Sequence, residues 1–556
     1  MYVAPDSIIM TPLQTPMLNI PEICKKTAIY FFQTLLSTVI LLALLEGAFR
    51  LLGFPPGAHR FVERIVISKH LTTQKPQGQF RIFTYGESTM HGAHYAPYSS
   101  PSQWMTAYLK DFLPGRDIKV VNFSRMGSGS HFAKEAFHDT LAYKPDLAIF
   151  YVGHNAFLHG NWKRDVDEDE KKTATFFRKI FQQSHFVSAV YRWINIQQMR
   201  LKKDTDDRIE YAQVETPPAG LGSENRTPKG SPVYQENLTF FRGNINGIID
   251  LAEAAHIPIL FLKPVGNLKD FAPNDSMHLK KLTPAQLLQW GQLFNDGQKA
   301  HKRGDWTAAT NAYMQAHEID GTYADLNYRL GQVYFKTGDL QKAKNFFEEA
   351  RDYDCVIVRA TKASLDILDE VWKTRHVPWL DTEKWLVSES PGGILGDPII
   401  EDNVHFSVKG HSLVGRALAE EIAYHNWIAP RPAWQFEKER PFEEISKELG
   451  ITKDLLFSAD LKMVSYLGSR YETRLIYALR AIDLSPSDPY ALRHLAWTYW
   501  LMGEKQKALQ VYKNLSLIHP EVLQEVLENQ PGIKKFYTVA FSQQLPQQVS
   551  ASIQTK

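Results

Sequence analysis

The sequence predicts an α/β domain with a parallel sheet, joined to all-α helical repeats and one N-terminal transmembrane helix. Three patterns lead to this prediction: short apolar runs alternate with helical periodicity, residues recur every 34 positions, and an uncharged apolar stretch lies near the N-terminus. The chain has 556 residues, enough for roughly three or four folding units of about 100 to 200 residues each.

Composition excludes several classes of protein. Hydrophobic residues make up 44% and charged residues 22%, values that exclude wholesale disorder. Lysine and arginine number 63 against 61 acidic residues, so the chain has no electrostatic footprint for nucleic acid. Cys24 and Cys355 lie on opposite sides of the apolar stretch and outside any metal-ligand spacing. This excludes a disulfide scaffold and a cysteine-ligated zinc site.

The apolar stretch is residues 27–45, TAIYFFQTLLSTVILLALL. Its 19 residues, at about 1.5 Å each, nearly span the roughly 30 Å hydrocarbon core of a bilayer. We predict a tail at 1–26, a transmembrane helix at 27–45 and a juxtamembrane segment at 46–79. A cleaved signal peptide and a buried core helix are the alternatives. The run is long for a signal peptide, however, and no clean small-residue cleavage site follows it.

Charges around this helix give two opposed indications of orientation. Lys25 and Lys26 abut its N-terminal end, whereas four basic residues follow it, namely Arg50, Arg60, Arg64 and Lys69. Large downstream domains are translocated largely regardless of charge. We therefore expect a short cytoplasmic tail, a single-pass anchor and an extracytoplasmic or periplasmic bulk.

The α/β domain is predicted to begin at Phe80, where the strand and helix patterns start to alternate. Its strands are expected at 80–85, 119–123, 146–152, 258–262 and 377–381. The domain then comprises residues 80–284 and 373–430. An insertion at 160–235 contains a charged run (163–172), an amphipathic helix (173–199) and a Pro/Gly-rich loop (216–232). It is either a lid over a site or a surface excursion.

About 115 residues separate the fourth and fifth predicted strands, and a repeat accounts for them. Five pairs of similar residues stand 34 positions apart: Gly297 and Gly331, Gly304 and Gly338, Ala309 and Ala343, Tyr313 and Phe347, and Ala316 and Ala350. This is the period of tetratricopeptide (TPR) helix pairs. The small residues would let two helices touch, and the aromatic residues would fill the gap between neighbouring pairs. We predict a TPR-like insertion over 285–372.

A second TPR-like array is predicted over 431–530, followed by a tail at 531–556. Its pattern consists of Ala481, Pro486, Leu495, Tyr499, Gly503, Ala508, Tyr512 and Pro520. Such repeats are stabilised by stacking on neighbours, so we expect each short array to dock on another part of the protein. Repeats of this type usually recruit protein partners, which we expect here as well.

Candidate catalytic residues follow the predicted strands, where open parallel sheets bind their ligands. Ser88 comes directly after the first strand, in the position of a nucleophile. Gly127 follows the second strand and Asn155 the third, and both supply the kind of N–H donor that an oxyanion hole requires. Asp402 precedes His405 by three residues, so the acid could orient an imidazole that activates the serine hydroxyl.

These four ordered blocks resemble the SGNH/GDSL hydrolase family, over about Phe80 to Trp427. The resemblance implies a flavodoxin-like α/β/α sandwich and a serine esterase. It makes Ser88 the nucleophile, His405 the general base and Asp402 its orienting acid. The Ser88 and Gly127 amides and the Asn155 side chain would form the oxyanion hole. Glu87, where the family usually has Asp, and Phe406, where Pro often follows the histidine, are departures that affect substrate preference or turn geometry.

Other residues near these blocks have alternative interpretations. We interpret His411 as a packing histidine, since no acid stands three residues before it. His91, His94 and His154 are weak metal candidates, because no carboxylate or cysteine stands at ligand spacing. Gly129 is an alternative to Gly127. The stretch Lys263–Asn267 either lines the substrate pocket or forms a simple turn.

The sequence therefore predicts a membrane-anchored acyl hydrolase that needs no cofactor or metal. Its expected substrate is an ester-bearing molecule, such as an O-acylated glycan of the cell envelope or a secreted polysaccharide. Two alternatives stay open: an O-acyltransferase that passes the acyl group to another hydroxyl, and a TPR-bearing membrane scaffold whose sandwich is not catalytic.

Overall fold

A computed structural model of the chain describes residues 20–52, 60–158, 184–187, 189–190, 193–194, 226–468 and 470–541. The chain divides into two compact units. One combines Met1–Gly57 with Thr173–Gln198, and the other combines Ala58–Lys172 with Met199–Lys556.

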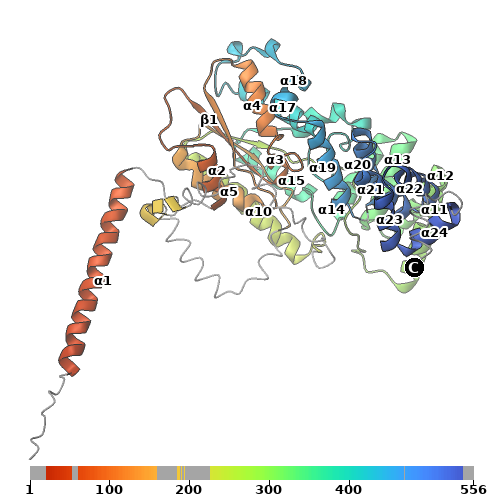
Figure 1. Ribbon diagram of the computed structural model, residues 1–556, viewed down its shortest axis with the longest axis horizontal. Coiled ribbons are helices and arrows are strands. Elements are labelled where there is room, and N and C mark those ends of the chain that lie inside the picture. Colours follow the sequence, from red (N-terminus) through yellow and green to blue (C-terminus); the bar gives the residue numbers. More distant parts are fainter. Residues whose placement is uncertain are drawn as a thin grey trace, which may run out of the picture. The chain divides into compact units, whose positions relative to one another are not determined.

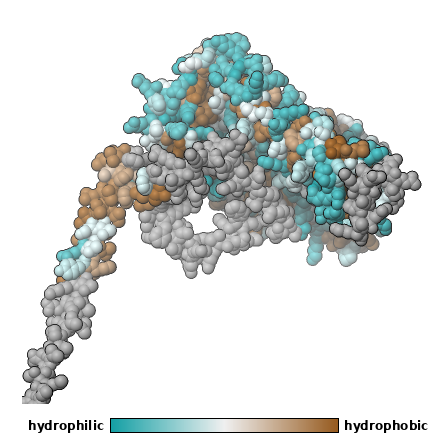
Figure 2. Space-filling model, in the orientation of Figure 1, coloured by the Kyte–Doolittle hydropathy of each residue, from teal (hydrophilic) through white to brown (hydrophobic). Residues whose placement is uncertain are grey.

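The first unit is dominated by α1 (Ile20–Leu51), which is longer than the predicted 27–45. Within it, Ile29–Leu51 is long and apolar enough to cross a membrane, judged by length and composition. Apolar side chains along this helix face outward (Figure 2). Of the predicted amphipathic helix at 173–199, residues 185–187, 189–190 and 193–194 are helical. Ser184 is described and is not helical, whereas the remaining residues of this stretch, the charged run 163–172 and positions 216–225 lie outside the described residues.

A parallel five-stranded sheet organises the second unit. Its strands are β1 (Phe80–Gly86), β2 (Ile118–Asn122), β3 (Leu147–Tyr151), β4 (Ile259–Leu262) and β5 (Trp379–Leu380), in the spatial order β2-β1-β3-β4-β5. This is the flavodoxin-like order, with its switch point between β1 and β3. The predicted α/β fold class is confirmed. β5 is shorter than predicted, with only two residues in the ladder.

Helices cover both faces of the sheet (Figure 1). On one face lie α4 (Pro101–Phe112) and α17 (Val408–Tyr424), which approach so closely that a Cβ on Gly415 would stand 2.5 Å from Trp104 Cβ. On the other face lie α5 (Ser130–Thr140), α10 (Pro232–Ala255) and α15 (Lys362–Thr374). The sheet thus has the two covered faces that an all-parallel sheet requires.

Three segments of the sandwich differ from the predicted boundaries. The juxtamembrane segment contains α2 (Arg60–Ser68), whose Val62 and Val66 are buried in the sandwich core. Crossover helix α10 already begins at Pro232, inside the predicted insertion 160–235. The repeat insertion ends at Tyr353 rather than 372, because Leu368 and Trp372 of α15 pack on the sheet. An amphipathic helix that follows other amphipathic helices gives no sequence signal of what its apolar face covers.

The first helical array consists of α11 (Pro284–Lys302), α12 (Trp306–Ile319), α13 (Ala324–Thr337) and α14 (Leu340–Tyr353). A Cβ on Gly297 would stand 2.4 Å from the Tyr313 ring, and one on Gly331 would stand 2.6 Å from the Phe347 ring. Each ring therefore covers the glycine of its own helix pair. Tyr313 also lies in one buried cluster with Leu326 and Leu330 of α13, so it fills space towards the next helix pair as well. The array docks on the sandwich through Tyr328, whose hydroxyl donates to the Lys269 carbonyl at 2.8 Å.

The C-terminal region is helical from α18 onward. Its helices are α18 (Phe442–Glu448), α19 (Lys453–Tyr466), α20 (Tyr471–Leu484), α21 (Pro489–Leu501), α22 (Lys505–Ile518), α23 (Pro520–Asn529) and α24 (Pro531–Phe541). Ile445 and Ala459 are buried in the sandwich core, so this region docks on the sandwich. α24 lies in the predicted tail 531–556, but Ile533 and Tyr537 pack against the repeats.

Short helices connect these elements. They are α3 (Ser88–His91), α16 (Thr382–Leu386) and the 3-10 turns η1 (Leu141–Tyr143), η3 (Val387–Glu389), η4 (Pro391–Gly393), η5 (Arg431–Ala433) and η6 (Phe436–Lys438). Among them, α3 matters most for the site, because it begins at Ser88 immediately beyond β1.

Candidate active site

A hydrogen-bonded chain links three of the predicted site residues. His405 Nε2 lies 2.7 Å from Ser88 Oγ, and its Nδ1 lies 2.5 Å from Asp402 Oδ2. Ser88 is the first residue of α3, whereas Asp402 and His405 lie in the loop before α17, more than 300 residues later. The fold therefore brings a hydroxyl, an imidazole and a carboxylate into the order that nucleophilic catalysis requires.

Asp402 is fully buried and is held in one orientation. Its Oδ1 accepts hydrogen bonds from the backbone N–H groups of Val404 and His405, at 2.9 and 2.8 Å. Burial opposes the charged form, but the charge and hydrogen bond of His405, joined by His94, hold the pKa of Asp402 well below its usual range. The carboxylate can thus stabilise an imidazolium on His405 without taking up a proton.

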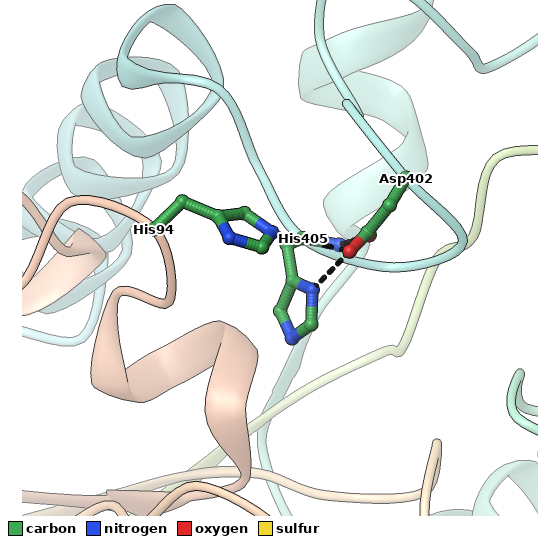
Figure 3. A group of neighbouring side chains, drawn as sticks. All are labelled: His94, Asp402 and His405. Atoms are coloured by element: carbon green, nitrogen blue, oxygen red, sulfur yellow. Dashed lines mark hydrogen bonds and ion pairs between the residues drawn. The ribbon is translucent and has the colours of Figure 1, made fainter. Parts of the chain in front are cut away.

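His94 is a second histidine on the same carboxylate (Figure 3). Its Nε2 lies 3.1 Å from Asp402 Oδ2, and its ring stands edge-on to the His405 ring at 4.8 Å between centroids. Burial lowers the pKa of His94, but the hydrogen bond and charge of Asp402 outweigh it and raise that pKa above its usual value. The backbone at His94 is left-handed, with φ 74°, a conformation that often marks functional sites.

His94, Asp402 and His405 are also residue types that bind metal ions, and their ligand atoms lie within 4.8 Å of one another. Two ligands on one Zn²⁺, each about 2.0–2.2 Å from the metal, stand more than about 3 Å apart in tetrahedral geometry. The 2.5 Å separation between His405 Nδ1 and Asp402 Oδ2 is instead a direct hydrogen bond. As placed, these side chains do not fit a metal centre, and we derive no metal-dependent step from them.

The three N–H groups predicted for an oxyanion hole belong to Ser88, Gly127 and Asn155. Neither Ser88 N–H nor Gly127 N–H donates a hydrogen bond to any described residue, and Gly127 adopts a left-handed φ of 65°. Asn155 Nδ2 donates one of its two hydrogens to the Ser128 carbonyl, at 2.6 Å, which fixes the amide and leaves the other hydrogen for a ligand. These are the three groups that the sequence predicted for an oxyanion hole.

Glu87 holds this donor side together. The residue is 1% exposed, and its carboxyl group accepts the backbone N–H groups of Gly153, His154 and Asn155, at 3.0 to 3.1 Å. Burial raises the pKa of Glu87 to about 8, although the three N–H groups favour its charged form. The sequence marks Glu87 only as a departure from the pattern of the family that it resembles. In the structure it ties the end of β3 to the end of β1.

The remaining histidines and the alternative glycine have structural roles. His154 is buried between the Tyr151 hydroxyl and the Ala360 N–H, and burial lowers its pKa to about 3. His91 Nδ1 pairs with the Ser124 carbonyl at 2.9 Å. His411 pairs with Ser99 Oγ at 3.0 Å, away from Ser88, in keeping with a packing histidine. Gly129 is the N-cap of α5.

The stretch Lys263–Asn267 supports the loop that carries His405 through hydrogen bonds. Asn267 N–H donates to the Asn403 carbonyl at 2.9 Å, and its side chain donates to the Ile400 carbonyl at 3.0 Å. Lys263 forms an ion pair with Asp369 at 2.6 Å. This stretch was predicted to be either a pocket wall or a simple turn. Its hydrogen bonds make it a support for the loop. Phe406 is fully buried beside the Tyr151 ring.

Comparisons with known proteins find two kinds of similar protein, lipases or esterases among the solved structures and tetratricopeptide repeat families. A GDSL-like lipase from Bacteroides thetaiotaomicron VPI-5482 is 10% identical, with a TM-score of 0.30 over 66% of this chain and 98% of that one. An acetylxylan esterase from Geobacillus stearothermophilus is 12% identical, with a TM-score of 0.27 over 62% and 94%. At these values the likenesses carry no functional argument. No curated protein shows a sequence match to the chain.

The repeats match family models directly. Residues 297–338 match a model described as TPR repeat, and residues 324–354 and 490–521 match models described as tetratricopeptide repeat. The TPR protein YrrB, a solved structure with an unusual peptide-binding site, is 14% identical with a TM-score of 0.13, over 42% of this chain and 90% of that one. The prediction of repeats is confirmed by the family models: both helical arrays contain tetratricopeptide repeats.

Proposed function

We propose that the chain is a serine esterase of the SGNH type that acts on ester-linked acyl groups. One observation carries the proposal: Ser88 Oγ lies within hydrogen-bonding distance of His405 Nε2 while His405 Nδ1 is held by Asp402. Ser88 is 9% exposed, and the His405 side chain is 12% exposed, so the pair reaches the surface. A hydroxyl with an oriented base beside it is the arrangement that acyl transfer uses.

In the first step, Ser88 Oγ attacks the ester carbonyl carbon while His405 Nε2 takes the hydroxyl proton. The carbonyl π electrons move to oxygen, and the N–H groups of Ser88, Gly127 and Asn155 stabilise the resulting oxyanion. Collapse of this intermediate breaks the bond to the alcohol, which leaves with the proton from His405. Water then attacks the acyl-enzyme in the same manner, which releases the acid and restores Ser88.

For placement, we propose that α1 is a membrane anchor and that the bulk of the protein is extracytoplasmic. The length and apolar composition of α1 support the anchor. For substrates, we propose acyl groups on glycans of the envelope or on secreted polysaccharides, in line with that placement and with the family resemblance. A protease-protected C-terminus in intact spheroplasts would contradict the outside placement.

The proposal is tested with the full chain in detergent micelles and an aryl acetate as substrate. We expect wild-type protein to release acetate, and Ser88→Ala to lose turnover to the background rate. Ser487→Ala, at an exposed loop serine, should behave as wild type. Adding a sugar as acceptor separates two outcomes, since acetate formation indicates hydrolysis and acetylated sugar indicates transfer. A folded wild-type protein with no turnover would favour the scaffold alternative.

A further inference from the structure

Two consecutive acids, Glu401 and Asp402, hold the loop that carries His405. The Glu401 N–H donates to the His405 carbonyl at 2.9 Å, which closes the loop on itself. Glu401 is 1% exposed, and its Oε1 accepts the Tyr95 hydroxyl at 2.6 Å. Tyr95 follows His94, which bonds Asp402. The neighbouring residues His94 and Tyr95 therefore each form a hydrogen bond with one of the two acids.

Arg480, from α20 of the C-terminal array, contacts the same carboxylate. Its Nη2 donates to Glu401 Oε1 at 2.9 Å and lies 3.0 Å from Asp460 Oδ1. Its Nη1 lies 3.9 Å from Asp397 Oδ1. Its guanidinium also lies over the Tyr477 ring, 5.0 Å from the centroid. Arg480 therefore reaches Glu401 from a different part of the chain than Tyr95 does. Its charge offsets two carboxylates that are each 1% exposed.

The helices around Arg480 are fixed to the sandwich by packing. Phe271, from the loop after β4, is buried among Met463, Leu467 and Tyr477 of α19 and α20. The Thr473 hydroxyl donates to the Asp270 carbonyl at 3.0 Å. α20 therefore has a defined position relative to the loop that begins at Glu401. A rigid support of this kind is what holds a catalytic side chain in its productive geometry.

We propose that Arg480 is a positioning residue for the candidate active site, acting through Glu401 on the Asp402–His405 loop. On this proposal the C-terminal repeats form part of the site and are more than a recruiting module. The expected effect of Arg480 on the reaction rate rests on the proposed function. Its expected effect on the position of the Asp402–His405 loop does not depend on any activity.

The first test is the rate at which a fluorophosphonate labels the full chain in micelles. Arg480→Met leaves Glu401 buried without its cation, and we expect labelling to slow by about 10²-fold, as when a catalytic group is displaced by about 1 Å. Arg480→Lys keeps the charge and should restore part of the rate. Arg493→Gln is the matched control, because Arg493 pairs with Glu525 within the array. It should label like wild type.

The double variant Arg480→Met/Glu401→Gln separates positioning from general damage. Gln keeps the acceptor for the Tyr95 hydroxyl and removes the unpaired charge, so we expect labelling about tenfold faster than in Arg480→Met alone. Recovery in the double variant would show that Arg480 acts through the charge of Glu401. The proposal is overturned if Arg480→Met labels at the wild-type rate, or if the double variant is no faster than the single one.

Hydrogen–deuterium exchange distinguishes failure of this inference from failure of the proposed function. The peptide that covers 399–407 contains the N–H groups of Glu401, Val404 and His405, all of which are bonded inside the loop. We expect these amides to exchange faster in Arg480→Met and unchanged in Arg493→Gln. If wild type is not labelled but this difference is found, the positioning role stands and the esterase proposal fails. Equal exchange in both variants overturns the positioning role.

Discussion

The two halves of the candidate site are assembled in different ways. The donor half, with Glu87, Gly127 and Asn155, comes from the ends of three neighbouring parallel strands, β1, β2 and β3. The acid–base half joins Ser88 to a loop 317 residues further along the chain. Asn267 supports that loop by a hydrogen bond to the Ile400 carbonyl, and Arg480 supports it by a hydrogen bond to Glu401.

This difference indicates what each half depends on. Parallel strands that share an edge bring the donors together whenever the sheet forms. The acid–base half needs the sheet, the loop after β4 and the C-terminal array to be in place together. A substitution in the donor half should therefore weaken transition-state stabilisation, whereas one in the acid–base half should remove a reacting group.

The largest effect is expected for His405→Ala, which removes the proposed base. We expect turnover of an aryl acetate to fall by about 10⁶-fold, the loss seen when a serine hydrolase loses its histidine. His376→Asn, at an exposed histidine that also has a positive φ, is the control and should keep wild-type turnover. A loss below tenfold in His405→Ala would mean that this half does not carry the chemistry.

A smaller effect is expected for Asn155→Ala, which removes one proposed oxyanion donor and leaves the proposed base in place. We expect kcat to fall by about 10² to 10³-fold with little change in KM, because the lost interaction is made mainly in the transition state. Asn246→Ala removes a side chain that bonds only the Arg242 carbonyl and Arg375, and it should leave kcat unchanged. A change confined to KM would place Asn155 in substrate binding instead.

Glu87→Gln tests whether the donor half has its own support. Gln keeps one acceptor oxygen, but its amide nitrogen cannot accept, so at least one of the N–H groups of Gly153, His154 and Asn155 loses its partner and the end of β3 should shift. We expect kcat to fall by about 10²-fold, comparable with a misplacement of about 1 Å. Unchanged kcat would show that the strand ends position Asn155 without Glu87.

His94→Gln should have the smallest effect on turnover. Asp402 then loses one donor but keeps the His405 ring and two backbone N–H groups. We expect a loss of roughly tenfold, the worth of one hydrogen bond to a charged group. The measurement is kcat across the acidic limb of the pH profile. A loss as large as that of His405→Ala would make His94 a reacting group.

Stability should also depend on pH through Glu87. Its pKa is raised by burial to about 8, whereas an unfolded glutamate titrates near about 4.3. Between these values the folded protein keeps a proton that the unfolded chain releases, so this group makes stability fall as pH rises. We expect the difference between the Tm of wild type and the Tm of Glu87→Gln at the same pH to decrease as the pH rises from about 5 to about 8. A difference in Tm that is constant over this range would contradict the shift.

Sequence reasoning reached the residues that follow the strands, because a strand end has a recognisable pattern and a known place in a parallel sheet. Ser88, Gly127, Asn155, Asp402 and His405 were predicted in this way, and the structure joins Ser88, Asp402 and His405 by hydrogen bonds. His94, Tyr95 and Arg480 were not assigned their contacts, because these join segments that only the complete fold brings together. The left-handed backbone at His94 is likewise invisible in the sequence.

The structure differs from the predicted domain boundaries where one amphipathic helix follows another along the chain. α15 has the same helical periodicity as the repeats before it, and only its burial against the sheet separates it from them. α24 was placed in a tail because its sequence no longer matches the repeat pattern, yet Tyr537 is buried against the repeats. Periodicity identifies an amphipathic helix, but it does not identify what the apolar face covers.

The central claim is that His405, oriented by Asp402, activates the hydroxyl of Ser88. It is tested most directly by treating the full chain with a fluorophosphonate and mapping the modified residue by mass spectrometry. The account predicts a single adduct on Ser88 that is absent from Ser88→Ala and from His405→Ala. An adduct that persists in Ser88→Ala, or labelling of Ser88 at an unchanged rate in His405→Ala, would contradict it.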